Sequence, residues 1–399
     1  MTTGRASSPL PQAALDAARR PFGESSLLPL EAYVDDDVFD WELRHVFERA
    51  WVCVGRASEL SVPGAQRAEQ VGRSSVMLVC DRDGELRAFA NICRHRGHEL
   101  LACGESTVRG VVQCPYHAWS YELDGSLRAA PHAGPQVVAV DNALVPLRVA
   151  EWGGWVFVDL GANGDVDAIS FTAHAGALVE IADAWHSADL VVAAEHRYEV
   201  AGNWKLVCEN YHECYHCPLI HPELCRVTDA GSGANVRDAP GAFVGGTMAL
   251  SPHAATMSTS GRLVGTVRSG LDELQRRQVV YLQLFPNLLI AFHPDYVLTH
   301  RLVPLTPGRT RIECQWLFAP IDVARPDFDP REAVELWDVT NRQDWAAVES
   351  MQRGMLSPHY RPGVLAHNED AVHQFVAMVA CAHLGVELQR GAVPAGYLR

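Results

Sequence analysis

The chain has 399 residues, of which 48% are hydrophobic and 20% charged, and this length is sufficient for two domains with separate cores. Its formal net charge is −15 and no run of Lys or Arg stands out, which argues against nucleic acid as a partner because phosphates repel an acidic surface. No stretch approaches the roughly 18 apolar residues of a membrane span, so we expect no membrane association.

The first part of the chain has the pattern of a short leader followed by an all-β domain. We expect residues 1–40 to form an N-terminal leader with a first helix, and residues 41–162 to form the all-β domain. Strand-type runs alternate there with turn signals, as where V-M-L-V-C precedes D-R-D-G and S-Y-E-L precedes D-G-S. The segment G-A-N-G-D then marks a domain boundary.

Two short segments of this domain each supply one cysteine and one histidine. Cys93 and His95 form C-x-H, and after an 18-residue gap Cys114 and His117 form C-x-x-H. Two thiolates and two imidazoles are the ligands of a Rieske 2Fe-2S cluster, in which the histidines raise the reduction potential. The four residues therefore predict a one-electron carrier.

A zinc site is the alternative for the same ligands, because two Cys and two His also suit tetrahedral zinc. Zinc fingers usually pair Cys with Cys and His with His along the chain, whereas each segment here supplies one of each, which favours the cluster. His98 is interpreted as a surface or supporting histidine. Nine of the eleven cysteines stand outside this motif at irregular spacings, which indicates free thiols in a cytoplasmic protein.

Residues 163–399 are expected to form a second, α+β domain. Helical sequence over 170–188 leads into the strand-like run H-R-Y-E-V. The remaining pattern predicts helices over 204–215, 331–351 and 368–383, and strands over 278–285, 288–292, 297–303 and 310–317.

The densest group of metal-binding side chains in the sequence lies in the segment 203–222. Glu213 and His216 share a face of the expected helix because three positions separate them. His221 would point off that face, but Pro218 is expected to end or kink the helix and let His221 return towards His216. Two histidines and one carboxylate form the triad that holds non-haem Fe(II) and leaves positions open.

In this order, the two motifs resemble those of the catalytic alpha subunits of Rieske non-haem iron oxygenases. The segments N-I-C-R-H-R-G-H and Q-C-P-Y-H-A-W match the ligand loops of that family, and E-x-x-H-x-x-x-x-H matches its mononuclear iron motif. The resemblance covers nearly the whole chain. It implies an all-β Rieske domain followed by a helix-grip (START-like) domain with an antiparallel sheet and long helices.

The resemblance also implies roles for single residues. The third iron ligand corresponds to Asp344 in N-R-Q-D-W, whereas composition alone leaves Asp338 and Asp370 as competitors. Glu213 corresponds to the acidic residue that bridges a cluster histidine of one protomer and an iron histidine of the next, which implies a head-to-tail homotrimer. Asn210 is expected to support the same site.

The implied activity is that of a terminal oxygenase. A flavin/iron-sulfur reductase or a ferredoxin supplies electrons, so NAD(P)H acts only indirectly, and O2 is used at the mononuclear iron to hydroxylate a small organic substrate. Glu213 in place of Asp and the run E-N-Y-H-E-C-Y-H-C resemble the homotrimeric branch that acts on quaternary ammonium compounds. We therefore expect oxidative N-demethylation, with Phe285, Phe292 and Tyr296 as candidate rings around the cation.

Two other functions remain open from the sequence. Ring hydroxylation of an aromatic compound would use the same rings together with leucines of the same strands, Leu282, Leu284 and Leu289. An electron-transfer protein with a Rieske cluster and no oxygenase chemistry is the alternative of another class. The second ligand set argues against it, because a carrier has no need of a mononuclear iron.

Overall fold

The computed structural model describes residues 7–134, 137, 142–161 and 168–391, and the chain divides into two compact units. The small unit is Val46–Ile169, and the large unit combines Met1–His45 with Ser170–Arg399. The segment expected to be a leader thus belongs to the large unit. Its first helix packs against the last helix of the chain, with Leu15 and Ala18 buried there.

The small unit is built from antiparallel sheets. Within its described residues, strands β1-β10-β9-β4-β3-β2-β5 form one sheet in that order, and β6-β7-β8 form another. A run of β-branched and other apolar residues makes β3 a buried central strand, and Asp81 accepts two backbone N–H groups in the turn that follows it. The strands are β1 (Val52–Arg56), β2 (Ala65–Val71), β3 (Ser74–Cys80), β4 (Leu86–Ala90), β5 (Ser106–Val108), β6 (Val112–Gln113), β7 (Ser120–Tyr121), β8 (Leu127–Ala129), β9 (Pro146–Trp152) and β10 (Trp155–Asp159), with 3-10 turns η1 (Phe47–Arg49) and η2 (Ala57–Leu60).

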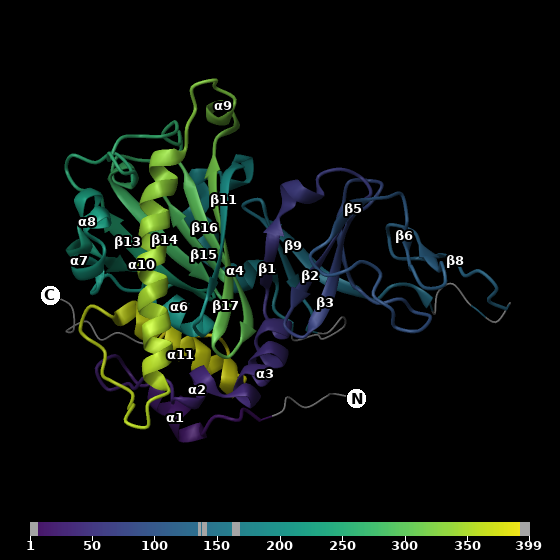
Figure 1. Ribbon diagram of the computed structural model, residues 1–399, viewed down its shortest axis with the longest axis horizontal. Helices are drawn as coiled ribbons and strands as arrows, with labels where there is room; N and C mark the ends of the chain where they lie inside the picture. Colours follow the sequence, from purple (N-terminus) through teal and green to yellow (C-terminus); the bar gives the residue numbers. More distant parts are fainter. Residues whose placement is uncertain (1–6, 135–136, 138–141, 162–167, 392–399) are drawn as a thin grey trace. The chain divides into compact units, whose positions relative to one another are not determined.

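The large unit has one antiparallel sheet as its centre (Figure 1). Among the described residues its strand order is β11-β17-β16-β15-β14-β13-β12, so the long strand β17 pairs with the edge strand β11 on one side and with β16 on the other. The strands are β11 (Val191–Val200), β12 (Ala234–Asn235), β13 (Phe243–Ala249), β14 (Gln278–Leu284), β15 (Leu288–Phe292), β16 (Val297–Thr306) and β17 (Arg309–Phe318). The expected strand over 288–292 coincides with β15, and the others differ from expectation only at their ends.

Helices surround this sheet and connect its parts. They are α1 (Gln12–Ala18), α2 (Glu31–Val34), α3 (Asp36–His45), α4 (Phe171–Ala175), α5 (Leu178–Ala182), α6 (Trp204–Tyr211), α7 (Cys217–Ile220), α8 (Pro222–Val227), α9 (Pro320–Val323), α10 (Arg331–Met355) and α11 (Asp370–Leu384), with 3-10 turns η4 (Asp183–Trp185), η5 (Ser187–Asp189), η6 (Ala230–Ser232) and η7 (Gln275–Arg277). α10 contacts α6, α8 and β11, and α11 is buried almost all round, as its apolar sequence requires. Within the described ranges, no helix has both the length and the apolar composition of a membrane span.

Candidate metal centres and the adjoining pocket

The segment that carries the second ligand group is not one helix. α6 ends at Tyr211, four residues before the expected end, and α7 begins at Cys217. The Glu213 carboxylate accepts the backbone N–H groups of Tyr215 and His216, which gives this stretch a turn in place of helical hydrogen bonds. Pro218 lies in the first turn of α7, so it starts a helix there, contrary to our expectation that it ends one.

The turn brings two histidines to one carboxylate. His221 Nε2 lies 2.8 Å from Asp344 Oδ1, and His216 Nε2 lies 3.3 Å from the same oxygen. Asp344 comes from the middle of α10.

The competing aspartates lie elsewhere, since Asp338 binds Tyr198 and Arg342, and Asp370 binds Asn235. One Asp and two His therefore converge as a triad suited to Fe(II).

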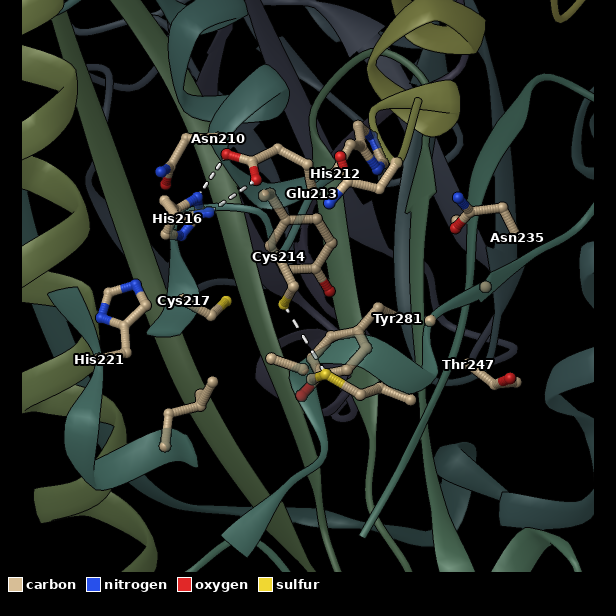
Figure 2. Close-up of a pocket in the computed structure, with 18 of the residues that line it drawn as sticks. Asn210, His212, Glu213, Cys214, His216, Cys217, His221, Asn235, Thr247 and Tyr281 are labelled. Atoms are coloured by element: carbon tan, nitrogen blue, oxygen red, sulfur yellow. Dashed lines mark hydrogen bonds and ion pairs between the residues drawn. The ribbon is translucent and has the colours of Figure 1, made fainter. Parts of the chain in front are cut away.

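The other nitrogen of each imidazole is held by a separate side chain. His216 Nδ1 donates to Glu213 Oε1, and His221 Nδ1 donates to Gln343 Oε1 at 2.7 Å. Histidines that bind metals usually donate the second ring N–H in this way, which leaves Nε2 as the ligand atom. Figure 2 shows Glu213 and Asn210 beside His216 on one side of the pocket.

The electrostatics at this point favour a cation. Burial alone would lower the pKa of His216, but hydrogen bonds to Asp344 and Glu213 outweigh it and raise that pKa to about 10. Burial would raise the pKa of Asp344, yet the hydrogen bonds from His216 and His221 lower it. A position that stabilises a positive charge so strongly, between nitrogen and oxygen donors, fits a divalent iron.

Cys217 is a further donor near the histidines. Ligand atoms of His216, Cys217 and His221 all lie within 4.8 Å of one another. A hydrogen bond with the Cys214 thiol, together with burial, raises the pKa of Cys217. The thiolate is the form that binds metals, so a protonated Cys217 is the weaker candidate and Asp344 is the better third ligand.

A cavity of about 370 Å³ adjoins this triad and is bounded by α6, α10, β13 and the first turn of α11. Three aromatic rings line it, and their polar groups are engaged elsewhere: Tyr211 O–H donates to Ile290 O, Tyr281 O–H to Met257 Sδ and Trp337 Nε1 to Tyr296 O–H. These rings therefore offer the cavity their apolar faces and edges. The other principal lining residues are Asn210, His212, Glu213, Cys214, Cys217, Leu224, Asn235, Arg237, Thr247, Met248, His367, Asn368 and Asp370.

The rings chosen from the sequence lie away from this lining. Phe285, Phe292 and Tyr296 are fully buried, with Tyr296 packed on Phe318, and they belong to the core. Asn210 lines the cavity, and its supporting role stays a prediction. Tyr211 and Trp337 could not be predicted as wall residues from the sequence, because their role depends on which helix face meets the sheet.

The Cys and His motif of the small unit forms two loops with the same backbone pattern. The carbonyls of Cys93 and Cys114 accept N–H groups from Gly97 and Ala118, respectively, four residues later. Gly97 and Ala118 both have positive φ, +72° and +57°. Each cysteine N–H also donates to the carbonyl five residues ahead. The two loops therefore share a backbone turn, although the histidine follows the cysteine by two residues in the first loop and by three in the second.

The four side chains of these loops approach one another. The thiols of Cys93 and Cys114 are buried and within hydrogen-bonding reach, whereas His95 and His117 are exposed, with ring centroids 4.8 Å apart. Tyr121 O–H lies 3.3 Å from Cys93 Sγ. These two thiols and two imidazoles would hold a Rieske cluster, with the sulfur ligands buried and the imidazole ligands exposed.

Comparison with known families agrees with both ligand sets. Residues 50–148 match the Rieske 2Fe-2S domain, and residues 187–382 match the ring hydroxylating alpha subunit (catalytic domain). The glycine betaine monooxygenase oxygenase subunit of Pseudomonas aeruginosa (strain UCBPP-PA14) is 30% identical over 365 residues, 84% of either chain. This chain belongs to the Rieske oxygenase alpha subunits. The expected family, α+β fold and oxygenase activity are thereby confirmed.

Other similar proteins show which members of the family this Rieske oxygenase resembles. The carnitine monooxygenase oxygenase subunit of Escherichia coli (strain K12) is 37% identical over 202 residues, 50% of this chain and 53% of that subunit. The structure of the quaternary ammonium Rieske monooxygenase CntA in complex with L-carnitine has a TM-score of 0.74 at 25% identity, covering 94% of this chain and 99% of that one. Naphthalene 1,2-dioxygenase from Rhodococcus sp. shares the fold alone, with a TM-score of 0.74 at 21% identity over 90% and 94% of the chains.

Membership also brings the family's cofactors and its working arrangement. The Rieske oxygenase carries a 2Fe-2S cluster and a mononuclear iron, and as an oxygenase subunit it needs a reductase partner. The alternative that this chain is an electron-transfer protein without oxygenase chemistry is therefore excluded.

Proposed function

We propose that this oxygenase hydroxylates an N-methyl group of a quaternary ammonium compound. The hydroxylated carbon then leaves as formaldehyde and the substrate retains a demethylated amine. The observation that carries this proposal is the wall of three aromatic faces beside the iron ligands, since a cation that cannot donate hydrogen bonds is held by ring faces at about 0.5–2 kcal/mol each. The relatives named for glycine betaine and carnitine support the same substrate class.

The residues of the large unit have distinct tasks in this proposal. His216, His221 and Asp344 would hold the iron, which when bound supplies O2 activation with electrons from the cluster. Glu213 and Gln343 keep the imidazoles oriented through their Nδ1 atoms. The aromatic walls hold the methyl-bearing cation beside the iron and keep water away from it.

Electron delivery in the proposed function involves a second protomer and an external donor. We propose a head-to-tail homotrimer, supplied by a flavin/iron-sulfur reductase or a ferredoxin that draws on NAD(P)H. Surface apolar residues support contacts with another chain at both metal sites: Tyr116 is 55% exposed next to the cluster histidines, and Tyr215 and Leu219 are 63% and 86% exposed next to His216.

We further place the enzyme in the cytoplasm. All eleven cysteines are described residues and none of them forms a disulfide, which suits a reducing compartment.

A substrate panel tests the proposed function. Glycine betaine, L-carnitine, choline and a set of aromatic acids are each added to the holoenzyme with a surrogate reductase, and O2 uptake and formaldehyde are measured. We expect at least one quaternary ammonium compound to stimulate O2 uptake with one formaldehyde released per O2 consumed. Stimulation by an aromatic acid alone, without formaldehyde, would instead establish ring hydroxylation and refute the proposal.

A further inference from the structure

The end of the cavity opposite the iron ligands is polar. It is formed by the β12–β13 edge and the first turn of α11, where Asn235 and Thr247 lie across the cavity from His216 and His221 (Figure 2). Arg237, in the loop after β12, belongs to the same lining. The cavity therefore has a metal-binding end and a second end built for polar contacts.

Arg237 has hydrogen-bonding capacity that its partner does not use. Its NH2 group lies 3.5 Å from Asp370 Oδ2, a long contact, and the side chain is 34% exposed where it lines the cavity. Asp370, in contrast, accepts a hydrogen bond of 2.6 Å from Asn235 Nδ2. A guanidinium has five N–H donors, so the free capacity here is that of a donor, and it suits an anionic group.

The end of the cavity that carries the iron ligands favours a positively charged group, whereas the Arg237 end favours an anionic one. Glu213 and Asp344 both line the metal end, and their carboxylates favour a positively charged group beside them. A ligand with a cation at one end and an anion at the other would therefore lie in a single orientation, with the cation towards Glu213 and the anion towards Arg237. The same orientation directs the N-methyl carbon to the iron, as demethylation requires.

We propose that Arg237 binds a substrate carboxylate, so that the substrate is a betaine, a small zwitterion with both a quaternary ammonium group and a carboxylate. This inference rests on the proposed function and narrows its substrate class. Arg237 is a specificity-determining residue: it selects glycine betaine or carnitine over choline, whose hydroxyl offers no charge to the guanidinium. Asn235 acts as a positioning residue that holds Asp370 and leaves Arg237 available.

Ligand binding to the anaerobic holoenzyme tests this inference. Isothermal titration calorimetry compares glycine betaine with its uncharged methyl ester, and L-carnitine with choline. We expect each carboxylate ligand to bind at least about tenfold more tightly than its partner in the pair, which is the size of effect that a hydrogen bond to a charged group produces. Arg237→Gln is expected to abolish this preference by weakening the carboxylate ligands about 10- to 100-fold, with choline affected less than about twofold.

Two further variants distinguish the effect of losing the Arg237 charge from an effect of any arginine substitution on folding. Arg237→Lys keeps the charge but loses the planar fork, and should restore part of the preference. Arg262→Gln removes a largely exposed arginine that is not among the lining residues, and should leave all affinities unchanged.

The outcomes distinguish this inference from the proposed function. Choline or the methyl ester binding to the wild-type enzyme as tightly as the carboxylate ligands would overturn the inference, even if Arg237→Gln failed to fold. A preference that survives in Arg237→Gln would also overturn it. In both cases formaldehyde release from a quaternary ammonium compound would still support the proposed function, whereas an enzyme that neither binds nor demethylates any of these compounds refutes the function itself.

Discussion

At the residue scale, Glu213 and Gln343 perform the same task with different charge. Each accepts a hydrogen bond from the Nδ1 of one histidine in the triad, but Glu213 is an anion and Gln343 a neutral amide. A neutral acceptor is thus sufficient to orient His221. We propose that the carboxylate at position 213 also serves electron transfer between protomers, the role that the family resemblance implies for it.

Glu213→Gln tests that purpose directly. The single oxygen of an amide at this position can keep the hydrogen bond from His216 Nδ1 while those from the backbone N–H groups of Tyr215 and His216 are lost, so we expect the variant still to bind its mononuclear iron. The loss of charge should slow oxidation of the reduced cluster by at least about 100-fold, a loss of roughly 3 kcal/mol of coupling. Single-turnover kinetics, following the cluster absorption after mixing with O2 and substrate, measure the rate.

Two variants serve as controls for this experiment. Glu223→Gln removes a carboxylate that lies 3.5 Å from Gln343, near the other histidine, and should leave the rate unchanged. His216→Ala should lose the mononuclear iron and all product formation, with the Rieske spectrum intact. If Glu213→Gln oxidises its cluster at the wild-type rate, Glu213 does not connect the two centres.

At the scale of elements, α6 is held in place by a buried ion pair. Lys205 Nζ donates to both oxygens of Glu42 on α3, at 2.8 and 2.7 Å, and both side chains are fully buried. Trp204 Nε1 and His383 Nε2 lie 2.9 and 3.1 Å from the same carboxylate. Through Glu42, the N-terminal segment thereby connects α6 to α11, which explains why this segment belongs to the large unit.

Lys205→Met is expected to destabilise the enzyme by about 3–5 kcal/mol, because it leaves the charge of Glu42 buried without its cation. Burial acts to raise the pKa of Glu42, and Lys205 is the largest of the opposing contacts that lower it. Without the lysine that pKa rises, so Glu42 takes up a proton in the folded state as the pH falls. The loss in free energy of unfolding, relative to the wild type, should therefore be larger at pH 8 than at pH 5, as measured by urea unfolding.

Glu42→Gln combined with Lys205→Met provides the matched comparison. The double variant removes both charges and keeps an acceptor for Trp204 Nε1, so it should recover most of the lost stability, independently of pH. A double variant as unstable as Lys205→Met would show that the lysine matters through packing and not through its charge.

The elements also show what the sequence was able to predict. The expected Cys and His ligands followed from chemistry and spacing, and β15 from its composition, because these depend on local sequence. Asp344 followed only from the family resemblance, since composition left Asp338 and Asp370 as competitors. The end of α6 could not be predicted, because the Glu213 side chain replaces helical hydrogen bonds with its own. The residues that line the pocket could not be predicted from local sequence either. Strand side chains alternate between the two faces of the sheet, so whether Tyr281 or Phe292 lines the pocket depends on register and packing.

At the scale of the whole molecule, the proposed ligands of each metal centre come from one unit. Cys93 and Cys114 belong to the apolar core of the small unit, together with Met77, Trp119 and Tyr121. The mononuclear iron triad comes entirely from α7, α8 and α10 of the large unit and the turns beside them. The chain therefore encodes two redox centres, each with its own fold around it.

This arrangement predicts that residues 46–169 fold and bind a cluster as an isolated polypeptide. The two ends of this segment are connected to each other, since Trp51 Nε1 donates to Ile169 O at 3.2 Å and Arg148 lies over the Trp51 ring. We expect the polypeptide to show the absorption and the rhombic electron paramagnetic resonance of a Rieske cluster, with no O2 uptake on adding any substrate. Cys114→Ser in the same polypeptide should abolish both signals. A polypeptide that is soluble but takes up no cluster would mean that the ligand loops require the large unit for their conformation, and the two centres would then not be separable.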